Sequence, residues 1–356
     1  MLRLENLDTD LALPPGVTAA TQAALGRDAD NSYLPFTGQE ALRAAVARHV
    51  GALTGQAYRP EQAVITCGGT EGMFDALLAT TDPGDEVVLT DPTYAGMIYR
   101  VRLAGAVPKL VPFVPQNGAW RLDREALRKA VTDRTRALFI MNPSMPSGAV
   151  LNQAEWQAVA DLCRSQNLWL LYNAAMERIL FDGRDYIHPA TLPGMAERTI
   201  TIGSVSKEYR MIGWRIGWVM GPETIMSDIA RVHIYNVVTP TGIAQAGALA
   251  ALQSPPEDLA AAVAQWQRRR DTLTDQLQGW PTIPAAGGWS QLLDVGTLGL
   301  DSFTASHRLL ERGKIAATPM RDWGDANSDQ FVRLVFSNEP VERLAEIGKR
   351  CARALS

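Results

Sequence analysis

The sequence predicts an α/β protein with a large domain, built on a mainly parallel mixed sheet covered by helices, and a smaller α+β domain. Three observations lead to this prediction. Short apolar segments alternate with segments of helical spacing over residues 63–220. A break at Ser254-Pro-Pro-Glu257 is followed by a long helical pattern and further strand signals. The length of 356 residues suits two domains better than one.

The large domain is predicted from its short, mostly apolar segments. Such segments are typical of parallel strands that are buried on both faces. We expect strands at 63–66, 86–90, 106–112, 137–141, 168–172, 199–203 and 216–220. We expect helices at 73–79, 123–131 and 154–165, where the apolar residues follow helical spacing.

The smaller domain follows the Pro-Pro break. Its expected elements are a helix at 258–278, a strand at 290–295, a helix at 303–312, a strand at 331–336 and a last helix from 341. The basic run Arg268-Arg-Arg270 within the first helix is interpreted as a solvated face. The predicted division is an N-terminal arm at 1–30 that joins the small domain, a large domain at 31–250 and a small domain at 251–356.

Composition excludes several classes of protein. Hydrophobic residues make up 46% of the chain and charged residues 20%, which is ordinary for a globular protein. The net charge of -4, without a basic stripe, argues against a nucleic-acid partner. No apolar run is long enough to span a membrane, and the first residues lack the apolar core of a signal peptide. We therefore expect a cytoplasmic protein with no membrane partner.

Cysteine and histidine spacing gives no sign of a metal site. Cys67, Cys163 and Cys351 are too few and too scattered for a disulfide framework, and are interpreted as reduced thiols. The histidines also lie far apart, without the spacing of a metal-binding pair on one helix. No metal is expected.

The sharpest chemical signal is a lysine that directly follows a predicted strand. The segment Gly203-Ser-Val-Ser-Lys207 is followed by Gly213-Trp-Arg215-Ile-Gly217. Burial at a strand end disfavours the ammonium form of a lysine, and a neutral amine is what Schiff-base chemistry needs. Ser204, Ser206 and Arg215 could donate hydrogen bonds to an anion such as a phosphate. A lone lysine would be a surface residue, but the whole pattern is too specific for that.

This segment resembles the Ser-x-Ser-Lys-x7-Arg-x-Gly signature of fold-type I pyridoxal-phosphate (PLP) enzymes, in the class I/II aminotransferase group. Further segments resemble that family in the same order along the chain: Tyr33-Leu-Pro-Phe-Thr-Gly, Thr66-Cys-Gly-Gly-Thr-Glu71, Asp91-Pro-Thr-Tyr94 and Phe331-Val-Arg333-Leu. The resemblance therefore extends over nearly the whole chain. It implies the fold-type I architecture, PLP as cofactor, and amino-acid and keto-acid substrates.

The resemblance also implies a role for each matching residue. Lys207 would form the Schiff base with the cofactor, and Arg333 would bind the substrate carboxylate. The cofactor phosphate would be held by Gly69, Thr70, Ser204, Ser206 and Arg215, because backbone N–H groups at a helix N-terminus bind phosphate well. Tyr94 would stack on the pyridine ring, and Trp289 would line the substrate pocket. Tyr33 would reach the phosphate of the neighbouring subunit, which implies a homodimer with shared active sites.

Three positions around the cofactor ring depart from the family. The family has Asn where Met145 stands in Asn142-Pro-Ser-Met145, so the hydrogen bond to the phenolic oxygen is lost unless Asn142 partly replaces it. The family has Asp, which pairs with the protonated ring nitrogen, where Asn173 stands. It has Tyr, a second donor to the phenolic oxygen, where Met176 stands.

These departures change the expected electronics of the cofactor. A carboxylate about 4 Å from a pyridinium is worth on the order of 4 kcal/mol at an effective dielectric constant near 20, and an amide removes most of this. We expect a neutral ring more often than a protonated one. The phenolate, without its two donors, should hold the Schiff-base proton to higher pH. A pH titration of the cofactor absorbance tests this, and an ordinary pKa would contradict it.

The leading hypothesis is a PLP-dependent aminotransferase that acts on an α-amino acid through a Lys207 Schiff base. The alternative is another PLP-dependent reaction on the same scaffold: elimination or replacement at Cβ or Cγ, aldol-type cleavage, racemisation or oxidation. A third interpretation is that one or more of the departures, Met145 first, was introduced by engineering. A silent subunit or a PLP-binding regulator is disfavoured, because Lys207, Arg215 and Arg333 are retained and no DNA-binding module precedes the fold.

Overall fold

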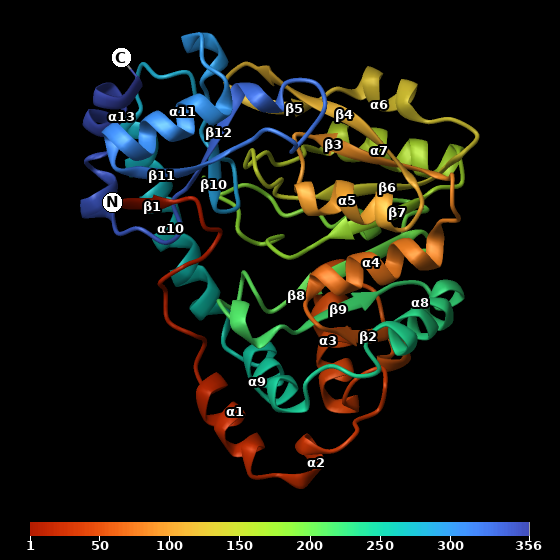
Figure 1. Ribbon diagram of the computed structural model, residues 1–356. Helices are drawn as coiled ribbons and strands as arrows, with labels where there is room; N and C mark the ends of the chain where they lie inside the picture. The colour runs from red at the N-terminus through yellow and green to blue at the C-terminus, as the bar shows by residue number, and fades with distance from the viewer. Residues whose placement is uncertain (356) are drawn as a thin grey trace.

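The chain folds around two sheets of unequal size, seen in the computed structural model of residues 1–355 (Figure 1). The larger sheet has eight strands in the order β2-β9-β8-β7-β6-β3-β4-β5. Its strands are β2 (Ala63–Thr66), β3 (Glu86–Asp91), β4 (Val107–Gln116), β5 (Ala119–Leu122), β6 (Thr135–Met141), β7 (Trp169–Asn173), β8 (Thr199–Ser204) and β9 (Gly217–Met220). The central pairs, β4 with β3, β3 with β6, β6 with β7 and β7 with β8, are parallel. The pairs that involve β9 or β5 are antiparallel. The predicted mainly parallel mixed sheet is confirmed.

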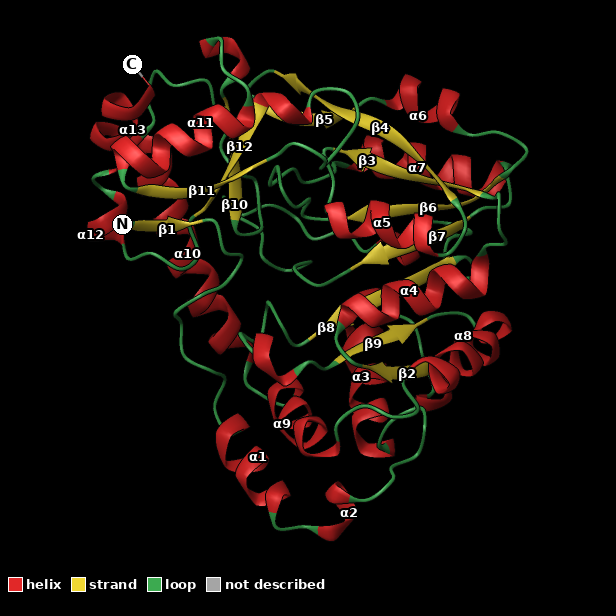
Figure 2. Ribbon diagram, viewed as in Figure 1, coloured by secondary structure: helices red, strands yellow, loops and turns green. Residues whose placement is uncertain are grey.

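Both faces of the larger sheet are covered by helices (Figure 2). These helices are α3 (Glu40–Thr54), α4 (Gly69–Thr80), α5 (Ala95–Leu103), α6 (Arg124–Ala130), α7 (Gln153–Ser165), α8 (Glu223–Asn236) and α9 (Gly242–Leu252). Successive side chains of a strand point to opposite faces. In β6, Phe139 packs in the core beneath α4 and α5, while Leu138 and Ile140 pack against α7. This burial on both faces explains why the strands are continuous apolar runs.

The smaller sheet has four strands in the order β1-β11-β12-β10, and only β1 is parallel to its neighbour. Its strands are β1 (Leu2–Leu4), β10 (Ser290–Asp294), β11 (Ile315–Pro319) and β12 (Phe331–Val335). Its helices are α10 (Pro256–Gln276), α11 (Ser302–Arg308), α12 (Val341–Leu344) and α13 (Ile347–Leu355). The predicted smaller α+β unit is therefore present.

The N-terminal segment connects the two sheets. β1 pairs with β11 of the smaller sheet, whereas α1 (Val17–Leu25) packs beside α9 and is followed by α2 (Asp28–Asn31). Figure 1 shows α1 and α2 at the bottom of the view, away from β1 on the left. The boundaries predicted at residues 30 and 250 stay predictions, and residue 356 lies outside the described residues.

Several sequence expectations need correction. The helix expected at 303–312 is α-helical only to Arg308 and continues as a π-helical turn, Leu309–Gly313. The last helix is divided into α12 and α13. Only Arg268 of the basic run in α10 is exposed; Arg269 and Arg270 are buried and pair with Asp10 and Asp182, so the run is not a solvated face as a whole.

None of the helices within residues 1–355 combines the length and the apolar character needed to cross a membrane.

Candidate active site

The carboxyl ends of the parallel strands meet at one edge of the larger sheet. β6 ends at Met141, β7 at Asn173 and β8 at Ser204. β2 runs in the same direction, since it and β8 are both antiparallel to β9, and it leads into the glycine turn before α4. Ligands of open α/β sheets bind at this edge. Topology alone therefore brings distant parts of the sequence together here.

A cavity of about 250 Å³ opens at this edge. It is lined by many of the residues predicted from the sequence: Gly69, Thr70, Tyr94, Met145, Asn173, Ser204, Ser206, Lys207, Arg215 and Arg333. It is also lined by Leu7, Met73, Met141, Ala175, Ile212 and Trp323, which sequence reasoning missed.

Three predicted site residues do not line the cavity. Tyr33 is 87% exposed on the surface of the single chain. Met176 is buried in the core that also contains Met145. Trp289 is buried too, but the Nζ atom of Lys207 lies 5.0 Å from the centre of its ring. Trp289 therefore contacts the cavity only from behind Lys207. Trp214 donates a hydrogen bond to Thr21 of α1 and also lies outside the cavity.

Lys207 lies deep in the cavity, three residues after the end of β8. Its Nζ donates a hydrogen bond of 2.7 Å to the carbonyl oxygen of Leu7. Burial lowers the pKa of Lys207 to about 8, with the charges of Arg333 and Arg215 acting in the same direction and Asp8 opposing them. The amine is therefore much easier to deprotonate than an ordinary lysine, as a Schiff-base lysine requires.

The turn before α4 forms a cradle for an anion. Gly68 has a positive φ of 79°, and a Cβ added there would collide with the guanidinium of Arg215. Arg215 in turn bonds Ser206 Oγ at 3.3 Å and the carbonyl oxygen of Ile212 at 2.9 Å. The first N–H groups of α4 have no partner within the helix, and they face the same region as the two serines. The donor set is cationic and hydroxylic, which fits a phosphate group.

Arg333 occupies the wall opposite this cradle, in the middle of β12. Its Nη2 donates to the carbonyl oxygen of Glu5 at 2.6 Å and to Thr318 Oγ1 at 3.0 Å. Its Nη1 contacts Met145 Sδ at 3.4 Å, and its Nε has no partner within the described residues. Burial lowers the pKa of Arg333 to about 10, although Glu5 acts in the opposite direction. No carboxylate of residues 1–355 forms an ion pair with this buried cation.

Asn173 closes the third side of the cavity. Its Oδ1 accepts a hydrogen bond of 3.1 Å from the N–H of Ala175, and its Nδ2 lies 3.4 Å from Met73 Sδ. Asn142 does not replace the donors lost at Met145 and Met176. Its Oδ1 accepts from the N–H of Leu151, and its side chain does not line the cavity.

Trp323 belongs to a loop of the smaller unit that folds over the larger one. Its carbonyl oxygen accepts a hydrogen bond from the N–H of Thr93, and Asp91 accepts from the N–H groups of Asp325 and Ala326. The Trp323 ring meets Tyr94 edge to face at 6.5 Å and lies 4.8 Å from the Arg333 guanidinium carbon. No local sequence motif predicts that Trp323 lines the cavity. Met73 could have been found, because it follows Thr70 by three residues on α4 and so shares its face.

Glu71, Asp75 and His233 form a charged cluster beneath the cradle, with ligand atoms close enough together to hold a metal ion. His233 Nδ1 lies 2.7 Å from Glu71 Oε1, and its Nε2 bonds the carbonyl oxygen of Phe36 at 3.0 Å. Burial alone would lower the pKa of His233, but hydrogen bonds to Asp75 and Glu71 raise it to about 9. The cluster is therefore an ion pair that anchors the first turn of α4, where Glu71 also accepts from the N–H of Cys67.

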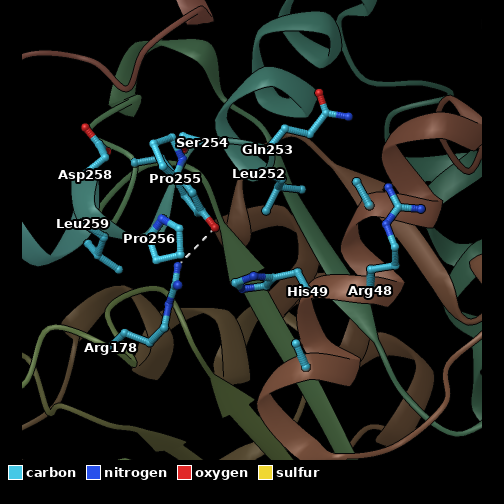
Figure 3. Close-up of a pocket in the computed structure, with 13 residues that line it drawn as sticks. Arg48, His49, Arg178, Leu252, Gln253, Ser254, Pro255, Pro256, Asp258 and Leu259 are labelled. Atoms are coloured by element: carbon cyan, nitrogen blue, oxygen red, sulfur yellow. Dashed lines mark hydrogen bonds between the residues drawn. The ribbon is translucent and has the colours of Figure 1, made fainter.

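A second cavity, of about 300 Å³, lies between α3 and the start of α10 (Figure 3). Figure 3 shows Arg178 and His49 reaching into it from different elements. Arg178 pairs with Glu208 at 2.7 Å and bonds the Tyr209 hydroxyl at 3.1 Å. The charge of Arg178 is thus satisfied internally, whereas Arg48, which also lines the cavity, forms no ion pair among the described residues. None of the predicted site residues lines this cavity.

The fold and the cavity together define an enzyme that carries an anionic cofactor beside a buried lysine. The chain belongs to the family described as aminotransferase class I and II, which matches residues 4–347. It is 31% identical to an arginine–pyruvate transaminase of Pseudomonas aeruginosa over 353 residues, 98% of this chain and 89% of that protein.

Solved structures agree with this assignment. N-succinyldiaminopimelate aminotransferase from Mycobacterium tuberculosis has a TM-score of 0.93 at 33% identity, covering 99% of this chain and 93% of that one. An aromatic aminotransferase from Pyrococcus horikoshii has a TM-score of 0.93 at 28% identity, covering 99% and 95%. The chain is therefore a fold-type I aminotransferase that uses PLP and acts on α-amino acids, as the sequence predicted.

Proposed function

We propose that this enzyme transfers the amino group of α-amino acids with apolar or aromatic side chains, with Lys207 as the catalytic residue and Arg333 as the carboxylate-binding residue. The observation that carries the proposal is Arg333, a buried cation without a carboxylate partner at the apolar end of the cavity. Such a cation needs an anion, and the α-carboxylate of a substrate supplies one.

Lys207 supports the chemistry through its lowered pKa. When bound, PLP supplies a carbonyl group and an electron-withdrawing ring. Burial lowers the pKa of the Lys207 amine to about 8, so a neutral amine is available in the cavity near that pH. A neutral amine there can take the proton from the substrate Cα and return it elsewhere. Trp289, behind Lys207, keeps that side of the amine free of water.

Arg333 is already oriented before a substrate arrives. Its Nη2 is fixed by Glu5 and Thr318, whereas its Nη1 and Nε have only a thioether or nothing to donate to. Each of these two groups keeps an N–H that can donate to a carboxylate oxygen. Because the guanidinium is held in place, less freedom is lost when the substrate binds.

The walls beside Arg333 favour an apolar substrate side chain. Leu7, Met145 and Trp323 line this end of the cavity, and methionine adapts to side chains of different shape. The solved relative from Pyrococcus horikoshii is named for aromatic substrates, while the Pseudomonas relative is named for arginine. Family membership alone therefore leaves the side chain open, and the apolar wall is what supports this choice.

We also propose a cytoplasmic homodimer. Tyr33 and Tyr235 are 87% and 86% exposed, and Phe36 is 47% exposed, which is unusual for large aromatic side chains on one chain. The resemblance to the family gives Tyr33 the role of reaching the partner's phosphate group. The cysteines of the described residues are free thiols, which is compatible with a reducing compartment.

The test is amino-group transfer measured with the purified enzyme loaded with PLP. Incubation with single amino acids, without any keto acid, should convert the cofactor to its aminated form and release an equal amount of keto acid. Phenylalanine and leucine should react faster than aspartate. Lys207→Ala should abolish conversion, whereas Lys349→Ala, an exposed matched control, should not. Release of ammonia or of a racemised amino acid, with the cofactor unchanged, would favour the alternative reactions instead.

A further inference from the structure

The orientation of the Asn173 amide decides which group it offers to the cavity. Its Oδ1 faces the backbone N–H of Ala175 at 3.1 Å. A flipped amide would place its NH2 group against that N–H, donor against donor, so the orientation is determined by the backbone. The NH2 group must then point the other way, toward Met73 Sδ at 3.4 Å. A thioether is a weak acceptor, so Asn173 has a donor to spare at the cavity wall.

The charges of the cavity are all positive. Lys207, Arg215 and Arg333 line it, and none of the described residues that line it is acidic. The acidic groups on neighbouring elements do not line the cavity, and each contacts another partner. Glu5 pairs with Arg3, Asp91 accepts two N–H groups of the Trp323 loop, and Glu71 and Asp75 contact His233. Asp8 lies near Lys207 and does not line the cavity.

We propose that PLP bound to this enzyme keeps its ring nitrogen unprotonated, with the NH2 group of Asn173 donating to it. A protonated ring nitrogen would find no carboxylate here, because none of the described residues that line the cavity is acidic and Asn173 offers only a neutral amide. Desolvation without a paired anion disfavours the protonated form. A neutral ring nitrogen is instead an acceptor, which matches the one free donor at this wall.

The inference deepens the proposed function, on which it rests through the cofactor. A neutral ring withdraws electrons less strongly than a protonated one. The charge that develops at the substrate Cα is then delocalised less deeply into the ring, and proton transfer through Lys207 carries more of the barrier. Asn173 would act on the reaction by setting the charge of the cofactor.

The experiment is a ¹⁵N NMR spectrum of the enzyme loaded with PLP that is ¹⁵N-labelled in the ring. The wild-type signal should lie at the position of a neutral pyridine and should not move as the pH is lowered toward the acid limit of the fold. Asn173→Asp supplies the missing carboxylate and should displace the signal by the full pyridine-to-pyridinium difference. Asn142→Asp is the matched control, because Asn142 is equally buried at the end of the neighbouring strand and does not line the cavity.

Each outcome of the NMR experiment either supports or overturns the inference. A pyridinium signal in the wild-type enzyme would overturn the inference. So would a neutral signal in Asn173→Asp, since Asn173 would then not face the ring nitrogen. A displaced signal in Asn142→Asp would show that any nearby charge suffices, which contradicts the role of Asn173. Failure of PLP to bind would remove the proposed function as well. A neutral ring in an enzyme that transfers no amino group would support the inference and overturn the proposed function alone.

Discussion

Two sets of buried arginines in this chain carry the same charge in opposite circumstances. Arg210, Arg269 and Arg270 are almost fully buried, and each pairs with a carboxylate of its own chain: Asp258, Asp10 and Asp182 respectively. Arg333 is just as buried but forms no ion pair with a carboxylate of the described residues; it contacts carbonyl, hydroxyl and thioether groups and the Trp323 ring, and the Glu5 charge acts on it without a direct contact. An internally paired arginine contributes to the fold. An unpaired one is costly to bury unless a ligand supplies the anion, which is the role proposed for Arg333.

The largest difference between the two kinds of arginine is expected when one of each is removed. Arg333→Leu should lower kcat/KM by about 10³-fold, on the order of 4 kcal/mol, because the substrate carboxylate loses its partner. Its free energy of unfolding should stay the same or rise. Arg270→Leu should do the reverse, with kcat/KM little changed and a loss of about 2 kcal/mol in stability. Steady-state kinetics and urea unfolding measure both, and equal effects on stability would contradict the distinction.

Inorganic phosphate should detect the unpaired cations without any cofactor. The enzyme freed of PLP should gain about 2.7 kcal/mol of stability at a phosphate concentration of 100 times Kd, because the anion binds only the folded cradle. Arg215→Gln should lose most of this protection. Arg178→Gln should keep it, since Arg178 is already paired with Glu208. Thermal unfolding with and without phosphate provides the measurement, and protection that is independent of Arg215 would place the anion elsewhere.

The dependence of stability on pH should have opposite signs for an unpaired and a paired cation. The pKa of Lys207 falls from 10.5 to about 8 in the folded PLP-free protein, so its charge destabilises the fold below pH 8. Stability is regained as the pH rises from about 8 toward 10.5. The pKa of His233 rises from 6.5 to about 9, so its contribution is complete below 6.5 and is lost as the pH rises through 9. Each effect is on the order of 3 kcal/mol.

Variants separate these two titrations. Unfolding curves measured between neutral and alkaline pH should lose the rising component in Lys207→Met and the falling component in His233→Gln. If Lys207→Met showed the same alkaline gain as the wild type, Lys207 would not be the group that is desolvated.

The smallest expected effect concerns the wall beside Arg333. Trp323→Ala should raise KM for phenylalanine by about tenfold, near 1.4 kcal/mol, because a substrate side chain loses an aromatic contact. Alanine as substrate should be affected much less. Trp280→Ala is the control, since Trp280 packs against the core and does not line the cavity, and it should change stability without changing KM. An equal rise in KM for both substrates would mean that Trp323 acts only through Arg333.

Local motifs predicted the parts of the site that are close together in sequence. Lys207 and Arg215 stand in one segment after β8, and the order of apolar runs predicted the sheet that places them. Leu7 and Trp323 could not be predicted this way, because each reaches the cavity from the smaller unit through tertiary packing. Arg269 and Arg270 were misread for a related reason. Consecutive charges on a helix look solvated until the partners, here Asp10 and Asp182, are brought to them by the fold.

The turn between β4 and β5 could have been predicted from its Asn-Gly sequence. Asn117 and Gly118 have φ values of 51° and 71°, as the two-residue turns of hairpins require. Helix α5 was not predicted, because it begins directly after Tyr94, its N-cap residue, which was interpreted only for its role beside the cofactor. The same residues carried a cofactor motif and the start of a helix, and only the motif was interpreted.

The carbonyl groups of the N-terminal segment are held by three cations of the main fold. Lys207 binds Leu7, Arg333 binds Glu5 and Arg210 binds Ala12. Lys207 cannot keep its bond to Leu7 once its amine is joined to the cofactor. Binding of PLP should therefore release the N-terminal segment at Leu7, while its hydrogen bonds at Glu5 and Ala12 remain. Protease cleavage near Leu7 would then report how much of a preparation carries cofactor, even in samples that absorb too weakly for spectroscopy.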